Sequence, residues 1–246
     1  MPTSTSERVA IVTGGSGGIG RVVAQRLAHD GMSVVVHYAG SAGRAEETVS
    51  AITADGGGAT SFKADVGEES EVAALFEHAR RQHGGVDVVI NAAGLMLLAP
   101  LAEFDLGQFD LMCRTNIRGT FLVSREAVRA ARAGGAIVNF ATSVLRLAFP
   151  TYSGYVATKG AVAAMTLILA RELRGRDVTV NTVAPGPTAT PLFLDGKDQA
   201  TIDHLSSLSP LERLGTPEDT AELVAFLAGP GRWVNGQVLF VNGGVV

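Results

Sequence analysis

The stretch "VTGGSGGIG", Val12 to Gly20, places five glycines in nine residues directly behind the apolar run "VAIV". The next segment, "RVVAQRLAHDG", has the apolar spacing of a helix. Glycine destabilises a helix by about 1 kcal/mol relative to alanine, so this much bare backbone between a strand and a helix indicates a turn with special demands. The stretch therefore favours a strand–turn–helix unit at the start of the chain.

Short apolar runs alternate with helical spacing along the rest of the chain. One helical segment carries Ile19, Val22, Val23 and Leu27, which fall on one face of a helix. The apolar runs are typical of strands that are covered on both faces of a parallel sheet. The pattern predicts the α/β class, a single doubly wound (Rossmann) parallel seven-stranded sheet with helices on both faces. The predicted strands are Val9–Thr13, Ser33–Tyr38, Thr60–Lys63, Val86–Asn91, Ala136–Ala141, Thr179–Ala184 and Val238–Val241.

Composition sets the outer limits of the prediction. The 246 residues, 46% of them hydrophobic, are expected to form one domain, residues 1–246, with residues 1–7 as a flexible tail. The net charge of −4 gives no electrostatic footprint for nucleic acid or an anionic membrane. No segment is expected to reach the roughly 18 apolar residues of a membrane span. Cys113 is the single cysteine, which excludes an internal disulfide and a cysteine zinc cluster; no metal is expected, and a cytoplasmic location fits best.

The glycine stretch matches two spacings of phosphate-binding turns. Gly15, Gly17 and Gly20 match G-x-G-x-x-G, and Gly14, Gly18 and Gly20 match G-x-x-x-G-x-G. Between a strand and a helix, such a turn lets a dinucleotide pyrophosphate approach the amides of the helix N-terminus. The alternative is a flexible turn with no ligand.

A second constellation is "YSGYVATKGAV", in which Tyr155 and Lys159 are four residues apart on a predicted helix. Both side chains therefore lie on one face, one turn apart. A phenol has an ordinary pKa of about 10, and a nearby ammonium favours the phenolate and lowers that pKa toward the range useful for acid–base catalysis. The alternative is a half-buried tyrosine beside a solvated lysine.

Together these motifs resemble the short-chain dehydrogenase/reductase family over essentially the whole chain. "TGGSGGIG" is similar to its cofactor turn and "YVATK" to its tyrosine–lysine motif. Other landmarks follow in order: "ADV", "NAAG", "RTNIRGTF", "NFATS", "NTVAPGPTAT" and "GQVLFVNGG". Within the family, the chain is similar to 3-oxoacyl-carrier-protein reductase-like members. Ala92 departs from the family pattern, because the family has a second asparagine at that position.

The resemblance implies roles for four residues. Tyr155 would be the general acid toward a carbonyl oxygen, or the base in reverse, and Lys159 would lower its pKa and hold the nicotinamide ribose. Ser143 would hydrogen-bond the substrate oxygen, and Asn116 would position a water that links Lys159 to solvent. The interval between Ser143 and Tyr155 is one residue shorter than is common, so strict counting would select Thr142. Aligning "TSV" with the family's Ser-Ser-Val favours Ser143, with Thr142 as the alternative.

The resemblance also implies the cofactor contacts. Asp65 would accept from the adenine amino group with Val66 beside it, and the segment after the sixth predicted strand would line the nicotinamide. The expected cofactor-binding residues are Gly14, Ser16, Gly17, Gly18, Ile19, Gly20, Tyr38, Ser41, Arg44, Asp65, Val66, Asn91, Ala92, Ala93, Gly94, Tyr155, Lys159, Pro185, Gly186, Thr188 and Thr190.

The end of the second predicted strand bears on the choice of nicotinamide cofactor. NAD-binding folds carry an acidic residue about 20 positions past the glycines, which bonds the ribose 2′-hydroxyl. Tyr38 occupies that position, and no carboxylate lies between Tyr38 and Glu46. His37, Ser41 and Arg44 could donate to a 2′-phosphate instead, so NADP(H) is favoured while NAD(H) stays possible.

A small-molecule carbonyl or alcohol substrate is expected, with a hydride exchanged between it and the nicotinamide. The predicted walls are mainly apolar and would suit a ketone or secondary alcohol with a hydrophobic body; they are Leu95, Met96, Leu97, Leu145, Phe149 and Tyr152, with residues 190–210 as a lid. The resemblance implies a homotetramer, in which the helices in Phe109–Arg132 and Ser153–Arg174 would pair across two-fold axes; both are apolar on more than one face. The alternative function is a catalytically silent cofactor-binding regulator or scaffold of the same fold.

Overall fold

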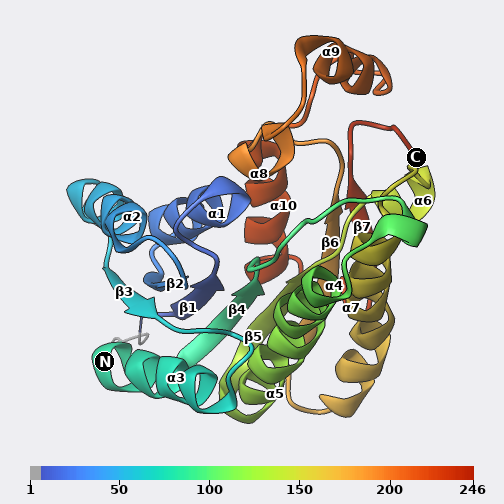
Figure 1. The fold of residues 1–246 in the computed structure, drawn as a ribbon. Helices are drawn as coiled ribbons and strands as arrows, with labels where there is room; N and C mark the ends of the chain where they lie inside the picture. The colour runs from blue at the N-terminus through green and yellow to red at the C-terminus, as the bar shows by residue number, and fades with distance from the viewer. Residues whose placement is uncertain (1–6) are drawn as a thin grey trace, which may run out of the picture.

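The computed structural model describes residues 7–246; the predicted tail, residues 1–7, lies outside the described residues except for Glu7. Strands and helices alternate along most of the chain (Figure 1). The strands are β1 (Val9–Thr13), β2 (Ser33–Tyr38), β3 (Ala59–Lys63), β4 (Val86–Asn91), β5 (Ala131–Phe140), β6 (Thr179–Pro185) and β7 (Val238–Val241). The helices are α1 (Gly18–His29), α2 (Ala42–Ala54), α3 (Glu69–His83), α4 (Leu106–Met112), α5 (Thr120–Ala130), α6 (Val144–Leu147), α7 (Ser153–Glu172), α8 (Pro191–Leu194), α9 (Gln199–Ser207) and α10 (Pro217–Ala228).

All seven strands form one parallel sheet in the order β3-β2-β1-β4-β5-β6-β7. The predicted seven-stranded, doubly wound fold is therefore confirmed. The strand order reverses between β1 and β4, which both belong to the middle of the sheet. In open α/β sheets, ligands bind at the carboxyl ends of the strands beside such a reversal, and this geometry fixes where a site can form.

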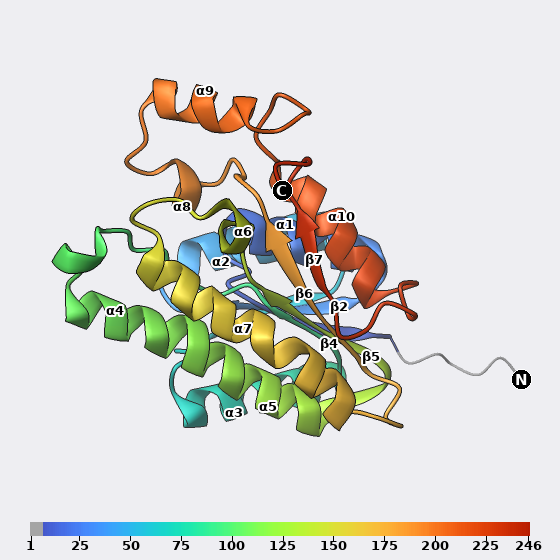
Figure 2. The same cartoon turned by 90° about the vertical axis from the view of Figure 1, so that its right-hand side faces the viewer.

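Helices cover both faces of the sheet (Figure 2). On β1, Ala10 and Val12 belong to the core beneath α1 and α10, whereas Ile11 belongs to the core beneath α3 and α5. All three are fully buried, because successive side chains of a strand point to opposite faces. This two-sided burial is the reason that the strands read as unbroken apolar runs.

Strand ends depart from the prediction where sequence signals are weak. β1, β2, β4 and β7 have the predicted bounds, whereas β5 begins at Ala131 rather than Ala136. The extra segment pairs with β4 only at Ala131, and the register shifts between Val86 and Val88. Its polar and glycine residues give no strand pattern, so only the pairing defines it.

The helix α7 corrects one expectation from the sequence. Among residues 7–246, it is the one helix long and apolar enough to span a membrane by length and composition, although no such segment was expected. It packs along β5 and β6, while Leu167 and Ile168 on its outer side are exposed.

Two short helices stand out from the body of the molecule at the carboxyl end of the sheet. Figure 1 and Figure 2 show α8 close to the sheet and α9 projecting above it. They occupy the segment 190–210 that the sequence assigns to a lid. Thr190 caps α8 by accepting a hydrogen bond from the Phe193 amide, which fixes the direction in which α8 leaves β6.

Candidate active site

The glycine turn between β1 and α1 uses the second of the two predicted spacings. Gly14 and Gly18 have φ angles of +68° and +50°, a left-handed conformation that favours glycine. A Cβ on Gly20 would lie 2.4 Å from the Gly14 carbonyl oxygen, so the first turn of α1 closes onto the strand end only with glycine there. These contacts assign structural roles to Gly14, Gly18 and Gly20.

Gly17, unlike Gly20, has open space around it at the N-terminus of α1. It has an extended φ of −174°, and a Cβ added to it would meet nothing within 4 Å. It stands at the N-terminus of α1, where no side chain caps the free amides. A bare backbone in open space at a helix N-terminus is suited to the close approach of a phosphate group, so the turn fits a dinucleotide.

The residues at the end of β2 and directly after it divide into a buried group and an exposed group. His37 is buried, and both of its ring nitrogens are engaged: Nδ1 accepts from the Gly14 amide at 3.2 Å, and Nε2 lies 2.9 Å from the Ala64 carbonyl oxygen. The expectation that His37 could donate to a phosphate is therefore wrong. Ser41 caps α2 by accepting from the Arg44 amide, and the exposed Arg44 side chain borders the cavity.

Asp65 and Val66 lie beside the cavity rather than in its wall. One Asp65 oxygen accepts from Arg114 at 2.6 Å and the other from the Gly67 amide at 2.8 Å. Val66 is buried and packs closely against Gly119, because a Cβ added to Gly119 would lie only 2.7 Å from a Val66 methyl group. Asp65 is thus held by Arg114, in the segment between α4 and α5, and by the turn at Gly67, and its contact to an adenine stays a prediction.

The helix α7 places Tyr155 and Lys159 one turn apart, facing the carboxyl ends of β4, β5 and β6. The Lys159 ammonium donates to the Phe140 carbonyl at 2.8 Å and lies 6.0 Å from the centre of the Tyr155 ring. Burial lowers the pKa of Lys159 to about 8. The ammonium is therefore protonated at neutral pH and close to the phenol.

The Tyr155 pKa differs from the sequence expectation. Burial raises it above the ordinary value of a phenol, and the nearby Tyr152 phenol raises it further, while a side-chain hydrogen bond with Thr142 lowers it. Lys159 does not produce the expected net lowering, because desolvation disfavours the phenolate and the ammonium is directed at the Phe140 carbonyl. Tyr155 is held as a neutral phenol, which is the form that can donate a proton.

The two hydroxyl residues at the end of β5 have different partners, which bears on the choice between Ser143 and Thr142. Ser143 is fully buried, and its hydroxyl donates to the Ala184 carbonyl at 2.9 Å and accepts from Asn242 at 3.2 Å. Its hydroxyl is thus turned into the β6 and C-terminal backbone. The Thr142 oxygen accepts from the Val144 amide at 3.2 Å, and its side chain lowers the pKa of the Tyr155 phenol. Thr142 and Ser143 both border the cavity, so the choice between them stays a prediction, for which these contacts favour Thr142, the alternative reached by strict counting.

Asn116 lies in a π-helix, Cys113–Gly119, that interrupts the run from α4 to α5. Its side-chain oxygen accepts from the Leu95 amide at 2.8 Å, and its side-chain nitrogen donates to the Leu95 carbonyl and to Thr158. A Cβ on Gly94 would lie 3.2 Å from the Asn116 oxygen and 3.4 Å from the Lys159 nitrogen. Asn116 therefore fixes the loop after β4 beside Lys159, and its place in a water relay stays a prediction.

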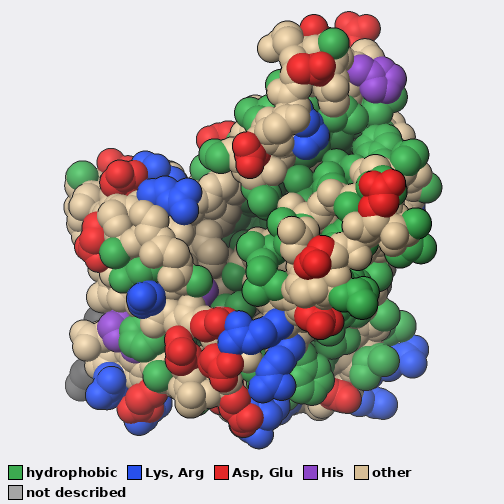
Figure 3. All heavy atoms as spheres, viewed as in Figure 1, with side chains coloured by type: hydrophobic (Ala, Val, Ile, Leu, Met, Phe, Trp, Pro, Cys, Tyr) green, Lys and Arg blue, Asp and Glu red, His purple; other side chains and the backbone are tan. Residues whose placement is uncertain are grey.

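A cavity of about 600 Å³ joins the glycine turn to the tyrosine helix, and Figure 3 shows the molecular surface hollowed between the α1–α2 side and the α8 side. Most predicted cofactor residues border it: Gly14, Ser16, Gly17, Gly18, Ile19, Gly20, Arg44, Ala92, Ala93, Gly94, Tyr155, Lys159, Pro185, Gly186, Thr188 and Thr190. Tyr38, Ser41, Asp65, Val66, Asn91 and Asn116 do not. Asn91 instead donates to Asn139 on β5 and to Ser124 on α5, in the buried space between the sheet and that helix.

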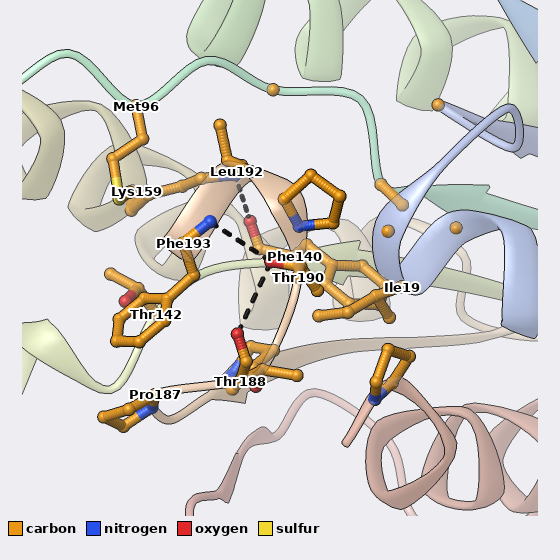
Figure 4. Close-up of a pocket in the computed structure, with 18 of the residues that line it drawn as sticks. Ile19, Met96, Phe140, Thr142, Lys159, Pro187, Thr188, Thr190, Leu192 and Phe193 are labelled. Atoms are coloured by element: carbon orange, nitrogen blue, oxygen red, sulfur yellow. Dashed lines mark hydrogen bonds between the residues drawn. The ribbon is translucent and has the colours of Figure 1, made fainter. Parts of the chain in front are cut away.

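The opposite end of the cavity is apolar. Figure 4 shows Ile19 on the glycine-turn side, with Met96, Thr142 and Phe193 on the other. The predicted walls Leu97 and Leu145 do not border the cavity; the apolar and aromatic residues that do are Leu95, Met96, Leu147, Phe149, Tyr152, Leu192 and Phe193. Sequence reasoning missed Arg21, although a cation directly after the glycine motif was a usable signal.

Comparisons with known proteins agree with this geometry. Residues 14–246 match the family model described as Enoyl-(Acyl carrier protein) reductase. The chain is 46% identical to a short-chain type dehydrogenase/reductase of Picea abies, over 97% of this chain and 92% of the relative. It is 39% identical to an NADPH-dependent aldehyde reductase-like protein, chloroplastic, of Arabidopsis thaliana, over 100% of this chain and 96% of that protein.

A solved structure shares the whole architecture. A short-chain dehydrogenase from Burkholderia cenocepacia, in complex with NADP, superposes with a TM-score of 0.91 at 36% identity and covers 98% of each chain. The glycine turn, the tyrosine–lysine helix and these similarities lead to one conclusion. The chain belongs to the short-chain dehydrogenase/reductase family.

Proposed function

We propose that the protein is an NADP(H)-dependent oxidoreductase that reduces an uncharged aldehyde or ketone with an apolar body, or oxidises the matching alcohol. The observation that carries this is the shared cavity, in which the glycine turn at one end and Tyr155, Lys159 and Thr142 at the other border one space. A cofactor that spans the cavity would present its reactive end to the phenol.

The choice of NADP(H) rests on charge at the adenosine end of the cavity. Arg21 and Arg44 border it, and Arg21 lies 3.6 Å from Glu47. Arg44 takes part in no ion pair within residues 7–246, so its guanidinium is available to a 2′-phosphate. A protein–NADP complex and an NADPH-dependent reductase among the relatives support the same choice.

The mechanism follows from three side chains. The nicotinamide supplies the hydride when it is bound. Tyr155, held neutral, donates its proton to the carbonyl oxygen as negative charge develops there. Thr142 donates to the same oxygen and stabilises that charge. Lys159, charged at neutral pH, stabilises the phenolate that remains and would hold the nicotinamide ribose.

The side chains that line the substrate end of the cavity favour a neutral carbonyl compound. The substrate end of the cavity has apolar and aromatic sides formed by Met96, Leu147, Phe149, Leu192 and Phe193. Lys159 borders this end and is directed at a backbone carbonyl, and Lys197, which lies over the Phe193 ring, donates to the Phe193 carbonyl. A neutral carbonyl compound can enter without leaving a charge unpaired, whereas a carboxylate beside the carbonyl would lack a partner.

The test is turnover across a panel of aldehydes, ketones, ketoesters and acyl thioesters, followed by oxidation of NADPH. The wild-type protein is expected to reduce apolar aldehydes or ketones. Tyr155→Phe is expected to lower kcat by about 10²–10⁴-fold while NADPH affinity, measured by fluorescence, stays nearly intact. Inactivity of the wild type across the panel, with NADPH still bound, would instead support the silent regulator.

A second experiment addresses the cofactor. One charge-assisted contact stabilises by roughly 1.5–3 kcal/mol, and each 1.4 kcal/mol is about tenfold in affinity. Arg44→Ala is therefore expected to raise the KM for NADPH by about ten- to a hundredfold and to leave the KM for NADH unchanged. Equal or better kcat/KM with NADH in the wild type would contradict the assignment of Arg44.

A further inference from the structure

His37 is a buried titratable side chain that the proposed mechanism does not use. It is the penultimate residue of β2, is 1% exposed, and lies between the glycine turn and the segment that follows β3. Its Nδ1 accepts from the Gly14 amide at 3.2 Å, and its Nε2 lies 2.9 Å from the Ala64 carbonyl oxygen. The ring therefore bridges two backbone segments.

The two partners determine the protonation state of the ring. The Gly14 amide can only donate, so Nδ1 must carry a lone pair; the Ala64 carbonyl can only accept, so Nε2 must carry the hydrogen. The bridge exists only for the neutral Nε2–H form. A protonated ring would direct an N–H from Nδ1 at the N–H of Gly14.

The bridge acts on the part of the turn that meets the cofactor. The His37 carbonyl also accepts from the Gly15 amide at 3.0 Å, so the residue holds two consecutive glycines. Gly14 has a left-handed φ and packs against Ala92 and Ala93, which border the same cavity. A change at Nδ1 therefore displaces backbone at the cofactor end.

We propose that neutral His37 is a positioning residue for the nucleotide: it holds the glycine turn in its binding form, so protonation of the ring weakens the binding of NADPH and NADH alike. The inference rests on the proposed function, because it takes the cavity to be a nucleotide site. It concerns binding alone and does not depend on which substrate is reduced.

The charges around the ring determine the direction of the effect. Asp65, on the segment after β3, and Glu71, on α3, favour the protonated ring, but Arg114 pairs with Asp65. The glycine turn contributes no charged side chain at this contact. Burial outweighs the carboxylates and lowers the pKa of His37 below its ordinary value. Binding is therefore intact at neutral pH and is lost as the pH falls toward and through the lowered value.

The experiment measures the dissociation constants of NADPH and NADH by fluorescence, without substrate, from pH 8 down to the lowest pH at which circular dichroism shows the protein to be folded. NADH is essential, because the 2′-phosphate of NADPH itself titrates near pH 6. For the wild type, both affinities are expected to stay level around neutral pH and to fall as the pH drops through the lowered pKa of His37. His37→Asn, whose amide oxygen can accept from Gly14 and does not titrate, should bind NADH within about threefold of the wild type at pH 8 and show no acid loss.

His37→Leu, which has no acceptor, should bind both nucleotides at least tenfold more weakly at every pH. A wild-type NADH affinity that is independent of pH, or the same acid slope in His37→Asn, would overturn the inference while leaving the proposed function intact. Failure to bind either nucleotide at any pH would overturn both.

A measurement on the wild type alone covers the case in which a variant does not fold. Because coupling between two binding events is reciprocal, saturating NADH must lower the pKa of His37 if protonation weakens NADH binding. Histidine ring signals in nitrogen NMR report both the tautomer and this pKa. An unchanged His37 pKa, or an Nδ1–H tautomer, would contradict the proposal.

Discussion

At the residue scale, neighbouring hydroxyls at the end of β5 have opposite environments. Ser143 is tied to the backbone of β6 and to Asn242, 99 residues later in the chain, whereas the Thr142 oxygen accepts from the Val144 amide and its side chain borders the cavity. A hydroxyl that already donates to a buried carbonyl would have to give up that bond to reach a substrate, at a cost of about 1–3 kcal/mol. The bond of Thr142 with Val144 uses an oxygen lone pair and not the hydroxyl hydrogen.

This difference gives a prediction with a matched control. Thr142→Val keeps the shape of the side chain and removes the donor to the substrate oxygen, so kcat is expected to fall by about 10²–10³-fold. Thr142→Ser keeps the hydroxyl and should lose less than about tenfold. Ser143→Ala should also lose less than about tenfold, together with some stability. Steady-state NADPH oxidation measures all three, and a larger loss in Ser143→Ala than in Thr142→Val would return the role to Ser143.

Sequence reasoning reached most of the candidate site but not the direction of these hydroxyls. Tyr155 and Lys159 are four residues apart, and the geometry of a helix brings side chains at that spacing together on one face. The choice between Thr142 and Ser143 depends on contacts with β6 and the C-terminal segment, which no local pattern reports. For the same reason His37 was expected to face a phosphate, although its ring is enclosed by Gly14 and Ala64.

At the element scale, two glycines of the turn have different roles: one allows close packing of the backbone, and the other leaves space for a ligand. Gly20 is confined by the Gly14 carbonyl, whereas Gly17 opens into the cavity. Gly20→Ala is therefore expected to lower the free energy of unfolding by about 1–3 kcal/mol, as overpacking does, which is a Tm decrease of about 2–12 °C.

The control for this prediction is Gly17→Ala. Its extended backbone accepts a side chain, so Tm should change by less than 2 °C, by analogy with other unstrained surface sites, while NADPH affinity falls because a methyl group occupies the approach to the helix N-terminus. Thermal unfolding and NADPH fluorescence distinguish the two variants. An unchanged Tm in Gly20→Ala would show that the turn relaxes around the added methyl group.

The secondary-structure elements were predictable where one pattern dominated. β1, β2, β4 and β7 are apolar runs bounded by turn residues, and their ends agree with the prediction. The π-helix at Asn116 has no signal in the sequence, because the extra residue per turn is stabilised by contacts of that side chain with Leu95 and Thr158. The early start of β5 likewise depends on pairing with β4.

At the scale of the whole molecule, one face carries apolar side chains that the chain itself does not cover. Leu106 and Leu111 on α4, Phe121 on α5, and Leu167 and Ile168 on α7 are between 45% and 75% exposed. Surfaces of this kind mark protein interfaces, and two helices with a shared apolar face suit pairing across a two-fold axis.

For the quaternary structure we therefore predict a homotetramer, with these helices at one interface and the C-terminal segment at another. Phe121→Glu combined with Ile168→Glu is expected to lower the mass measured by light scattering at micromolar concentration. Ser50→Glu, on the exposed side of α2 across the sheet, should leave the mass unchanged. A monomeric wild type would contradict the prediction.

The place of β1 in the sheet has a consequence for synthesis of the chain. β1 lies near the N-terminus, yet it is central and pairs with β2 on one edge and β4 on the other. Because a ribosome releases the N-terminus first, β1 can join β2 and β3 while its second edge waits for Val86–Asn91 to emerge. An open apolar strand edge is prone to pair with other chains. A nascent chain that stalls before β4 is therefore expected to aggregate or to require a chaperone.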